Sequence, residues 1–330
     1  MPHHFYDWSN PRKPPLLQLH SIAKHEVIKT YLEHHIERLT AHSRMARLRL
    51  TIVDGFAGGG IYRHAETDKL CAGSPFIFLE TVHRMERKIR KKRTKKFCID
   101  AAYYFIDRDN DALSFLRSQL HKKGYGDLIG ERVFLLHGSF SNLFAGLMEI
   151  VRSRGGRAFF LLDQYGYKDI PLSLIKQIFT RHPSAEVLFT FAADALVNYM
   201  AHRKQYYKCV HNIDPSGRLL PREDIVKLNR LKNRSAYKTK ITEWRLMTKH
   251  KLLCRLIRLC GVRYCVPYFI VSPKSNRAYW FLHFSNHLKS RNQMLKLCGR
   301  NHNVVVRHKM SGFNMFGYAP RKHSATEIDY

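Results

Sequence analysis

The sequence predicts an α/β fold in which a parallel sheet carries helices on both faces and finishes in an antiparallel hairpin. Apolar strands alternate with amphipathic helices from residue 48 to residue 191, and parallel neighbours need such crossover connections. Three predicted strands end on an acid, at Asp54, Asp107 and Asp163. Two aromatic-rich runs, 264–272 and 278–285, are separated by a short polar break that suits a hairpin.

The predicted helices and strands follow in a regular order. Apolar residues at helical spacing predict a first helix over residues 28–39. Residues 61–72 are polar and are expected to be irregular. Ser74 then suits the N-cap and Pro75 the first turn of a helix that continues through a basic run to Lys96. The five strands of the parallel sheet are predicted at residues 48–54, 102–107, 133–137, 158–163 and 186–191.

Composition points to a globular chain with a polyanionic partner. The 330 residues are 45% hydrophobic and 25% charged, which is the balance of a soluble protein with a sizeable core. Lysine and arginine number 57 against 26 acids, a formal charge of +31. Such an excess favours nucleic acid as the partner over a merely solvated surface.

Cysteine usage and hydropathy bound the cellular location. Seven cysteines without a Cys-x-x-Cys pair predict neither a disulfide framework nor a zinc ribbon, and they indicate the reducing cytoplasm. Cys254, Cys260 and Cys265 are expected to be core residues, and no catalytic metal is expected. The N-terminus has no signal-peptide pattern and no apolar run suits a bilayer, so we expect no membrane association.

Three parts are expected along the chain. Residues 1–197 would form an N-terminal helix and a Rossmann-like cofactor-binding core, and residues 264–330 the terminal hairpin and a tail. Between them, residues 198–263 are predicted to be a basic helical insertion that binds substrate. The stretch 203–263 carries 17 lysine or arginine residues and 4 acids, a net charge of +13.

Five parallel strands followed by an antiparallel hairpin are the strand plan of class I S-adenosylmethionine methyltransferases. On that plan the glycine-rich turn after the first strand would wrap the methionine end of the cofactor, and Asp107 would accept from the ribose hydroxyls. Ser139 and Phe140 would lie against the adenine. A tight turn with a helix-capping aspartate is the structural alternative. The turn residues predicted to bind cofactor are Asp54, Gly55, Phe56 and Gly58.

The candidate catalytic loop is Asp163, Gln164, Tyr165 and Tyr167. Methyl transfer to an exocyclic amine needs an acceptor for the N–H, and an unstacked base needs an aromatic platform. Asp163 and the Gln164 carbonyl would supply the acceptors and either tyrosine the platform. The loop resembles the Asp-Pro-Pro-Tyr signature of amino methyltransferases but lacks both prolines. An ordinary strand-to-helix turn is the alternative.

Two basic segments, 84–96 and 203–263, are candidate phosphate-contacting surfaces, with solvated helix faces as the alternative. Aromatic residues interleave with the second, and phosphate neutralisation with base stacking is how unpaired nucleic acid is bound. The residues predicted to bind nucleic acid are Arg90, Lys91, Lys92, Arg93, Arg203, Lys204, Arg234 and Lys238.

Over nearly its full length the chain resembles the three-Cys-motif partner family, known as TcmP. The resemblance implies a separate three-cysteine-motif protein as a partner. The shared motifs are His20-Ser-Ile-Ala-Lys24-His25, Asp54-Gly-Phe-Ala-Gly58, Gly73-Ser-Pro75, Phe105-Ile-Asp107, Asp163-Gln-Tyr-Gly166, Tyr279-Trp-Phe-Leu-His-Phe-Ser285 and Phe313-Asn-Met-Phe-Gly-Tyr318.

More distantly, Lys24 and His25 ahead of an Asp-x-x-Ala-Gly turn are similar to the large-subunit ribosomal RNA adenine-N6 methyltransferases. That similarity implies that both residues approach the cofactor, with His25 reaching it, Asp107 on its ribose and Asp163 on the target amine. We therefore expect a methyltransferase that acts on a base of nucleic acid, with RNA favoured over DNA. A nucleic-acid-binding protein that kept the fold without catalysis is one rival. A nicotinamide-dependent oxidoreductase is the other, and the terminal hairpin argues against it.

Overall fold

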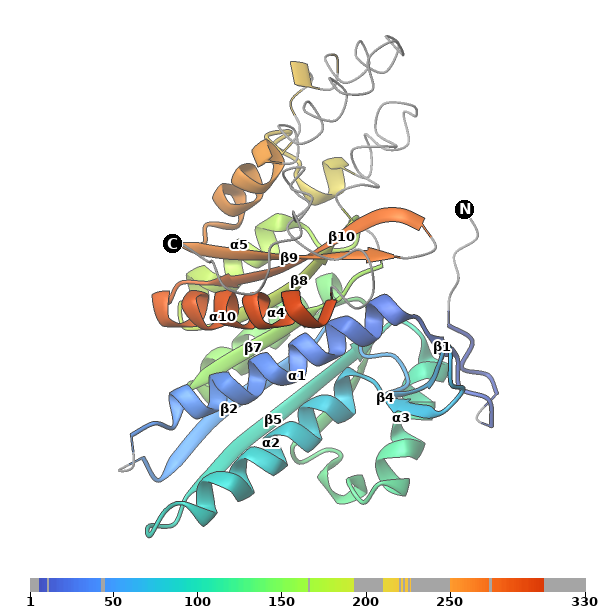
Figure 1. Ribbon diagram of the computed structural model, residues 1–330, viewed down its shortest axis with the longest axis vertical. Helices are drawn as coiled ribbons and strands as arrows, with labels where there is room; N and C mark the ends of the chain where they lie inside the picture. The colour runs from blue at the N-terminus through green and yellow to red at the C-terminus, as the bar shows by residue number, and fades with distance from the viewer. Residues whose placement is uncertain are drawn as a thin grey trace.

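A seven-stranded sheet forms the centre of the molecule (Figure 1). The computed structural model describes residues 6–305 apart from 11, 43–44, 166, 193–209, 220, 222, 225, 227–249 and 273–274. The strands lie in the order β6-β5-β2-β7-β8-β10-β9. Their bounds are β2 Arg47–Asp54, β5 Cys98–Asp107, β6 Val133–His137, β7 Arg157–Leu162, β8 Glu186–Phe191, β9 Tyr264–Ser272 and β10 Ser275–Ser285.

The strand directions confirm the predicted fold class. Strands β6, β5, β2, β7 and β8 pair in parallel, and β10 runs antiparallel to both β8 and β9. The hairpin strand next to the parallel block is thus the last strand in the sequence, as in the class I methyltransferase arrangement. Central strands are buried on both faces: every residue of β8 is buried, and so is β2 from Leu50 onward.

Helices cover both faces of the sheet. Helices α1 Leu19–Leu39, α2 Ser74–Lys91, α3 Asn110–Lys122 and α10 Leu288–Val305 share one apolar core with one face. Figure 1 shows α10, α1 and α2 side by side in front of the strands. Helices α4 Phe140–Arg154 and α5 Leu172–Arg181, with the helical residues 250–260, pack on the other face. The alternation of faces follows from the right-handed crossovers between parallel strands.

A second, small sheet corrects one expectation. Residues 61–72 are not irregular, because β3 Ile61–His64 and β4 Leu70–Ala72 pair antiparallel, and β1 Leu16–Leu17 adds in parallel to β3. Ile61 and Tyr62 are buried, so these two side chains anchor a segment that is mostly exposed or half-buried. The β1 partner comes from the N-terminal segment, which no local pattern around residue 61 reveals.

The start and end of α2 also differ from the prediction. Gly73, not Ser74, occupies the N-cap, and Ser74 is already in the first turn. The helix ends at Lys91 rather than running to Lys96. Elsewhere, a short 3₁₀ turn at Gly126–Leu128 follows α3. Arg93 explains the early end of α2, because its guanidinium donates to the carbonyls of Thr40 and Met45 and turns the chain towards β5.

Burial tests the expectation for the three cysteines. Cys260 is fully buried and Cys265 half-buried, but Cys254 is exposed, so the prediction that all three are core residues is wrong for Cys254. Among the described residues, no helix is both long and apolar enough to cross a membrane.

Candidate active site at the carboxyl ends of the strands

Three aspartates from neighbouring strands converge at one edge of the sheet. Asp54 ends β2 and pairs in register with Phe105 of β5 on one side and Leu161 of β7 on the other. Asp107 and Asp163 each lie two residues beyond those partners, so they flank Asp54. The crevice beyond the carboxyl ends of parallel strands is where α/β sheets bind ligands. Strand register therefore assembles the predicted acidic cluster.

Asp54 is fully buried and carries an unsatisfied oxygen. Its Oδ1 accepts from the Phe56 amide at 3.2 Å, and its Oδ2 is buried without a hydrogen-bond partner in the described part of the chain. Burial raises the pKa of Asp54 to about 7, while the Ser74 side chain and the Phe56 amide oppose the rise. The charges of Asp163 and Asp107 push the same pKa upward. The free Oδ2 of Asp54 can therefore bind a proton or accept a hydrogen bond from a ligand.

Asp107 fixes the glycine-rich turn. Its Oδ2 accepts from the Gly58 amide at 2.8 Å, and its Oδ1 from the Asp109 amide at 2.9 Å. Burial raises the pKa of Asp107, and these two hydrogen bonds partly counter the rise. A carboxylate offers about four lone pairs, so each oxygen can still accept a further hydroxyl.

Aromatic side chains, rather than open space, surround the later glycines of the turn. A Cβ on Gly58 would lie 2.3 Å from the Tyr62 hydroxyl, and one on Gly59 would lie 2.3 Å from the Trp8 ring. Gly58 also has a φ of +58°. Gly55 is different, because a Cβ there would meet Phe140 and Leu162 at 3.1–3.2 Å. The turn needs its glycines for close packing as well as for backbone shape.

Asp163 forms a partly buried ion pair with Lys24 of α1. Lys24 Nζ lies 2.5 Å from Asp163 Oδ1 and 2.6 Å from Oδ2, and the Thr190 hydroxyl of β8 donates to Oδ1 at 2.5 Å. Burial alone would raise the pKa of Asp163, but the Lys24 charge and these hydrogen bonds lower it below its usual value. Asp163 is therefore held as a carboxylate, with one Oδ2 lone pair left over.

Two histidines of α1 lie beside this pair as neutral groups. Burial and the Lys24 charge lower the pKa of His25 to about 4, although the Asp163 charge and a backbone hydrogen bond to Ala72 act in the opposite direction. The pKa of His20 is lowered to about 4 for the same two reasons. Lys24 and His25, predicted through the ribosomal RNA methyltransferase similarity, thus lie against Asp163.

The residues of the candidate catalytic loop separate into different environments. Gln164 is buried, and its side chain accepts from the Asp169 and Ile170 amides and donates to the Thr190 carbonyl. Tyr167 is buried with its ring centroid 6.3 Å from that of Phe191. Tyr165, in contrast, is 68% exposed. Only Tyr165 of the two tyrosines presents a free ring face.

Ser139 and Phe140 both have structural partners. Ser139 is the N-cap of α4, and its hydroxyl accepts from the Asn142 amide at 3.1 Å. Phe140 is buried against Gly55 and stacks edge-on with Phe144. The partly buried Phe56 also packs against this core. Of these residues only Phe140 is fully buried, and Ser139 and Phe56 are partly exposed.

The structure adds Thr190 and Tyr6 to the site and gives a further place to Ser74, which the sequence predicted only as a helix start. Thr190 orients Asp163, and Ser74 lies beside Asp54. Tyr6, 37% exposed, packs edge-on against Tyr62, and burial together with the Asp163 charge raises the pKa of Tyr6 to about 12. No local motif marks Thr190 or Tyr6, because they reach the site from β8 and the N-terminal segment.

The predicted nucleic-acid contacts lie elsewhere or outside the described residues. Arg90 and Lys91 end α2, and Lys92 and Arg93 follow it. These four are at the amino ends of β2 and β5, far from the aspartates. The remaining predicted contacts, Arg203, Lys204, Arg234 and Lys238, lie outside the described residues.

Comparisons with solved structures find methyltransferases at low similarity. No protein-family model and no curated protein matches the sequence, so the TcmP resemblance stays a prediction. The N-terminal domain of human METTL16 in complex with SAH is 11% identical at a TM-score of 0.31, covering 78% of this chain and 70% of that one. The O-methyltransferase TomG from Streptomyces achromogenes, in complex with SAM, is 12% identical at 0.34, covering 78% and 80%. The kinase-methyltransferase WbdD is 11% identical at 0.38, covering 80% and 39%. The fold assignment itself rests on the strand order and register of this chain.

The arrangement suits a cationic ligand. Three carboxyl groups meet at this edge, and Lys24 is the paired cation of Asp163 alone, in a chain whose formal charge is +31. The unsatisfied Oδ2 of Asp54 and the spare lone pairs of Asp107 can accept from ammonium and hydroxyl groups. Asp163, which stays ionised, can orient an N–H donor but is a weak base.

Proposed function

We propose that this protein is an S-adenosylmethionine-dependent methyltransferase that acts on an exocyclic amine of a nucleic-acid base, with RNA favoured. The convergence of Asp54, Asp107 and Asp163 at the carboxyl ends of adjacent parallel strands carries the proposal. Their negative charge complements a cofactor with an ammonium and a sulfonium group.

The cofactor-binding residues would divide the ligand between them. Asp107 would accept from the two ribose hydroxyls while it holds the Gly58 amide. The buried Oδ2 of Asp54 would accept from the ammonium of the methionine end, which would also keep Asp54 ionised. When bound, S-adenosylmethionine supplies an electrophilic methyl group on sulfur.

Asp163 would position the target amine. Its remaining Oδ2 lone pair can accept one N–H, which turns the nitrogen lone pair towards the methyl group. Lys24 and Thr190 hold the carboxylate in place, and its low pKa makes Asp163 an acceptor rather than a strong base. The exposed ring of Tyr165 would stack on the unpaired base.

The charge of the chain and a sequence resemblance support the choice of partners. An excess of 31 positive charges favours a polyanionic substrate. The TcmP resemblance adds a three-cysteine-motif protein as a second candidate partner, which co-purification of the two tagged chains tests.

Radiolabelled S-adenosylmethionine tests the proposal on separate pools of RNA, DNA and protein. We expect label in one nucleic-acid pool and none with Asp163→Asn. Asp163→Asn alone leaves the Lys24 charge unpaired. The double variant Asp163→Asn, Lys24→Met removes both charges of the pair. Asp127→Asn, on an exposed 3₁₀ turn, is the matched control and should keep full activity.

The alternatives have their own signatures. Confirmed cofactor binding without label in any pool contradicts catalysis and supports a nucleic-acid-binding protein that kept the fold. Thermal stabilisation by NAD but not by S-adenosylmethionine contradicts the methyltransferase assignment altogether.

A further inference from the structure

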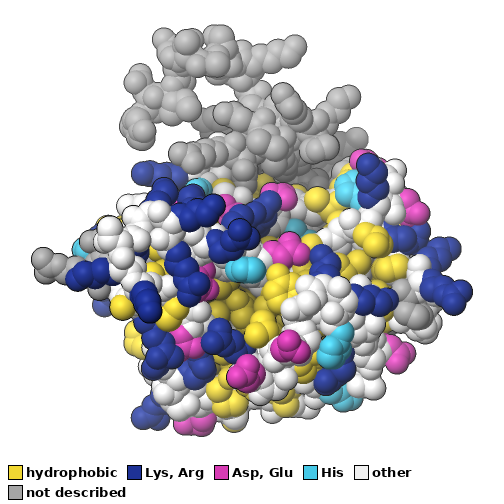
Figure 2. Space-filling view, turned by 90° about the horizontal axis from the view of Figure 1, so that it is seen from below, with side chains coloured by type: hydrophobic (Ala, Val, Ile, Leu, Met, Phe, Trp, Pro, Cys, Tyr) yellow, Lys and Arg dark blue, Asp and Glu magenta, His cyan; other side chains and the backbone are white. Residues whose placement is uncertain are grey.

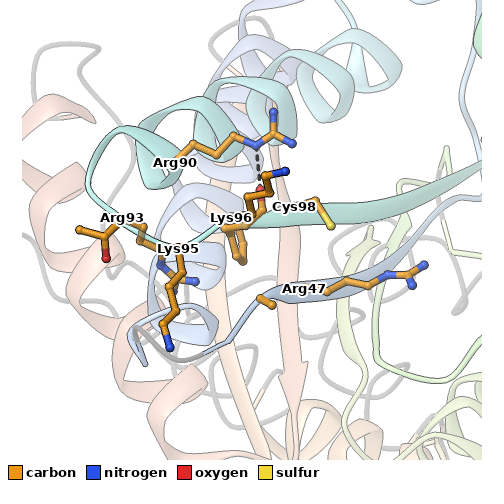
Figure 3. Close-up of a pocket in the computed structure, with 9 residues that line it drawn as sticks. Arg47, Arg90, Arg93, Lys95, Lys96 and Cys98 are labelled. Atoms are coloured by element: carbon orange, nitrogen blue, oxygen red, sulfur yellow. Dashed lines mark hydrogen bonds between the residues drawn. The ribbon is translucent and has the colours of Figure 1, made fainter.

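A basic pocket lies at the end of the sheet opposite the aspartates. It has a volume of about 760 Å³, within the range of ligand sites, and opens where β2 and β5 begin. Figure 3 shows Arg90, Arg93, Lys95 and Lys96 reaching it from the end of α2 and the connection to β5, and Arg47 from β2. On the side of the molecule seen from below, lysine and arginine dominate over acids (Figure 2).

Three of the five cations that line the pocket already have hydrogen-bond or ion-pair partners within the protein. Arg90 donates to the Phe97 carbonyl at 2.7 Å and pairs with Glu86 at 2.8 Å. The Arg93 guanidinium donates to backbone carbonyls and lies 4.5 Å from the Phe97 ring centroid. Arg47 pairs with Asp100. These contacts hold the three arginines in place, and only Arg90 and Arg47 are paired with a carboxylate among the described residues.

Lys95 and Lys96 are the two remaining cations of the pocket. Both are exposed, and within the described part of the chain neither is within ion-pair distance of a carboxylate. Two adjacent unpaired lysines on a wall built by arginines form a site of strong positive potential, where anions with several oxygens bind.

We propose that this pocket binds backbone phosphates of the nucleic-acid substrate, with Lys95 and Lys96 as phosphate ligands and Arg90 and Arg93 as the residues that build it. The proposal deepens the proposed function and rests on it for the nature of the substrate. It also separates the predicted basic run into ligand-binding lysines and structural arginines.

The distance between the pocket and the aspartates defines the size of the substrate. Strand β5 begins with Cys98 at the pocket and ends nine residues later with Asp107, about 30 Å away at ~3.3 Å per residue. A nucleic acid that occupies both places must span this distance. At about 3.4 Å per base pair that corresponds to roughly nine base pairs of double helix.

Helix α2 offers a path between the two sites. It begins with Ser74 beside Asp54 and ends with Lys91 beside the pocket. Its exposed side carries Arg87 and Lys91, which make no ion pair among the described residues, whereas Arg84 and Lys88 pair with glutamates of α1. Arg87 and Lys91 both lie in the last five residues of α2, whereas the half of the helix towards Asp54 carries Glu80, so a stem along α2 would meet unpaired cations near the pocket. We therefore infer a stem-loop substrate, with the stem on α2 and the unpaired target base at the aspartates.

Charge reversal at the pocket tests this inference. Lys95→Glu, Lys96→Glu is compared with Lys176→Glu, Lys296→Glu, two exposed lysines on α5 and α10 that give the same change of net charge. Fluorescence anisotropy measures the binding of RNA and DNA hairpins whose stems have about five or about twelve base pairs. We expect the pocket variant to bind the long stem about tenfold more weakly and the salt slope to fall by about 2. The short stem and the control variant should change little.

The outcomes separate this inference from the proposed function. Equal losses in the pocket and control variants, or equal losses for short and long stems, contradict a phosphate pocket. Binding of polyglutamate is measured in the same way as a probe for an acidic protein. If the pocket variant loses polyglutamate binding but keeps hairpin binding, the partner is an acidic protein and the phosphate-pocket proposal is wrong. A long RNA or DNA stem that is affected selectively identifies the substrate. Calorimetric binding of S-adenosylmethionine should be the same in both variants, and absence of that binding contradicts the methyltransferase proposal alone.

Discussion

Asp54 and Asp163 lie at the ends of adjacent strands, yet the pKa of one is raised and the pKa of the other is lowered. Burial without a paired cation raises the pKa of Asp54 to about 7. Lys24 and Thr190 outweigh burial at Asp163 and lower its pKa. One group can take or release a proton near neutral pH, and the other stays charged. Environments that separate two carboxyl groups in this way are typical of functional sites.

Gly58 illustrates how tightly the turn is built. Its φ of +58° disfavours other residues, and a Cβ there would lie 2.3 Å from the Tyr62 hydroxyl. Gly124 has a similar φ of +76° but nothing within 4 Å of its Cβ position. A substitution at Gly124 therefore meets only backbone strain, whereas one at Gly58 meets both backbone strain and steric overlap with Tyr62.

We expect Gly58→Ala to destabilise the protein by about 3 kcal/mol, and Gly124→Ala by only about 1 kcal/mol. Urea unfolding of both variants measures the difference in free energy of unfolding. Equal losses would mean that the Tyr62 side chain moves aside freely and that the turn is looser than its contacts indicate.

A buried polar cluster ties four secondary-structure elements together. Glu186 begins β8 and accepts from Tyr31 of α1 at 2.9 Å and from His283 of β10 at 2.8 Å. Ser285 of β10 and Ser290 of α10 donate to its other oxygen at 3.1 and 2.6 Å. Burial opposes ionisation, but the hydrogen bond and charge of His283, the charge of His35 and the Ser290 hydrogen bond lower the pKa of Glu186 to about 2. The hairpin and α10 are thereby fixed to the parallel block.

Glu186→Gln should reduce the free energy of unfolding at neutral pH by about 3 kcal/mol, because an amide offers donors where donors already point. The folded pKa lies below the unfolded value of about 4.3, so this stability is complete above that value and is lost as pH falls towards 2. Thermal unfolding between about pH 5 and pH 3 should show a shallower acid slope in the variant. Glu149→Gln, from an exposed pair with Arg181, is the control and should change little. An unchanged acid slope in Glu186→Gln would contradict the ionised state of this group.

The net charge of +31 acts on the molecule as a whole. Like charges spread over one compact chain repel each other, and this repulsion lowers the stability of the folded state. Surface pairs such as Arg84 with Glu33 and Lys88 with Glu37 offset a part of it.

Added salt should therefore stabilise the protein. Between about 0.01 M and about 0.1 M sodium chloride the Debye length falls from about 30 Å to about 10 Å, so the midpoint of thermal unfolding should rise by a few degrees. Potassium chloride at the same ionic strength should give the same rise, which distinguishes screening from specific ion binding. A midpoint that falls with salt would show that the ion pairs outweigh the repulsion.

Much of the fold could be read along the chain. Alternating apolar strands and helices predicted the five parallel strands and the hairpin, because periodicity and short turns are local properties. Residues 61–72 and the end of α2 were predicted wrongly, since the β1 partner of β3 and the carbonyl partners of Arg93 come from distant segments. Helix α10 was not predicted, because residues 288–305 were assigned only to a tail.

The candidate site divides in the same way. The sequence alone placed three aspartates at strand ends, because a parallel sheet brings its carboxyl ends to one edge. Only the tertiary structure could pair Lys24 with Asp163 across 139 residues, leave Asp54 without a cation and put the Lys95–Lys96 pocket at the other end of β5. Charge and burial around a side chain depend on distant parts of the chain, so the chemistry of each carboxylate was decided by packing rather than by its neighbours in sequence.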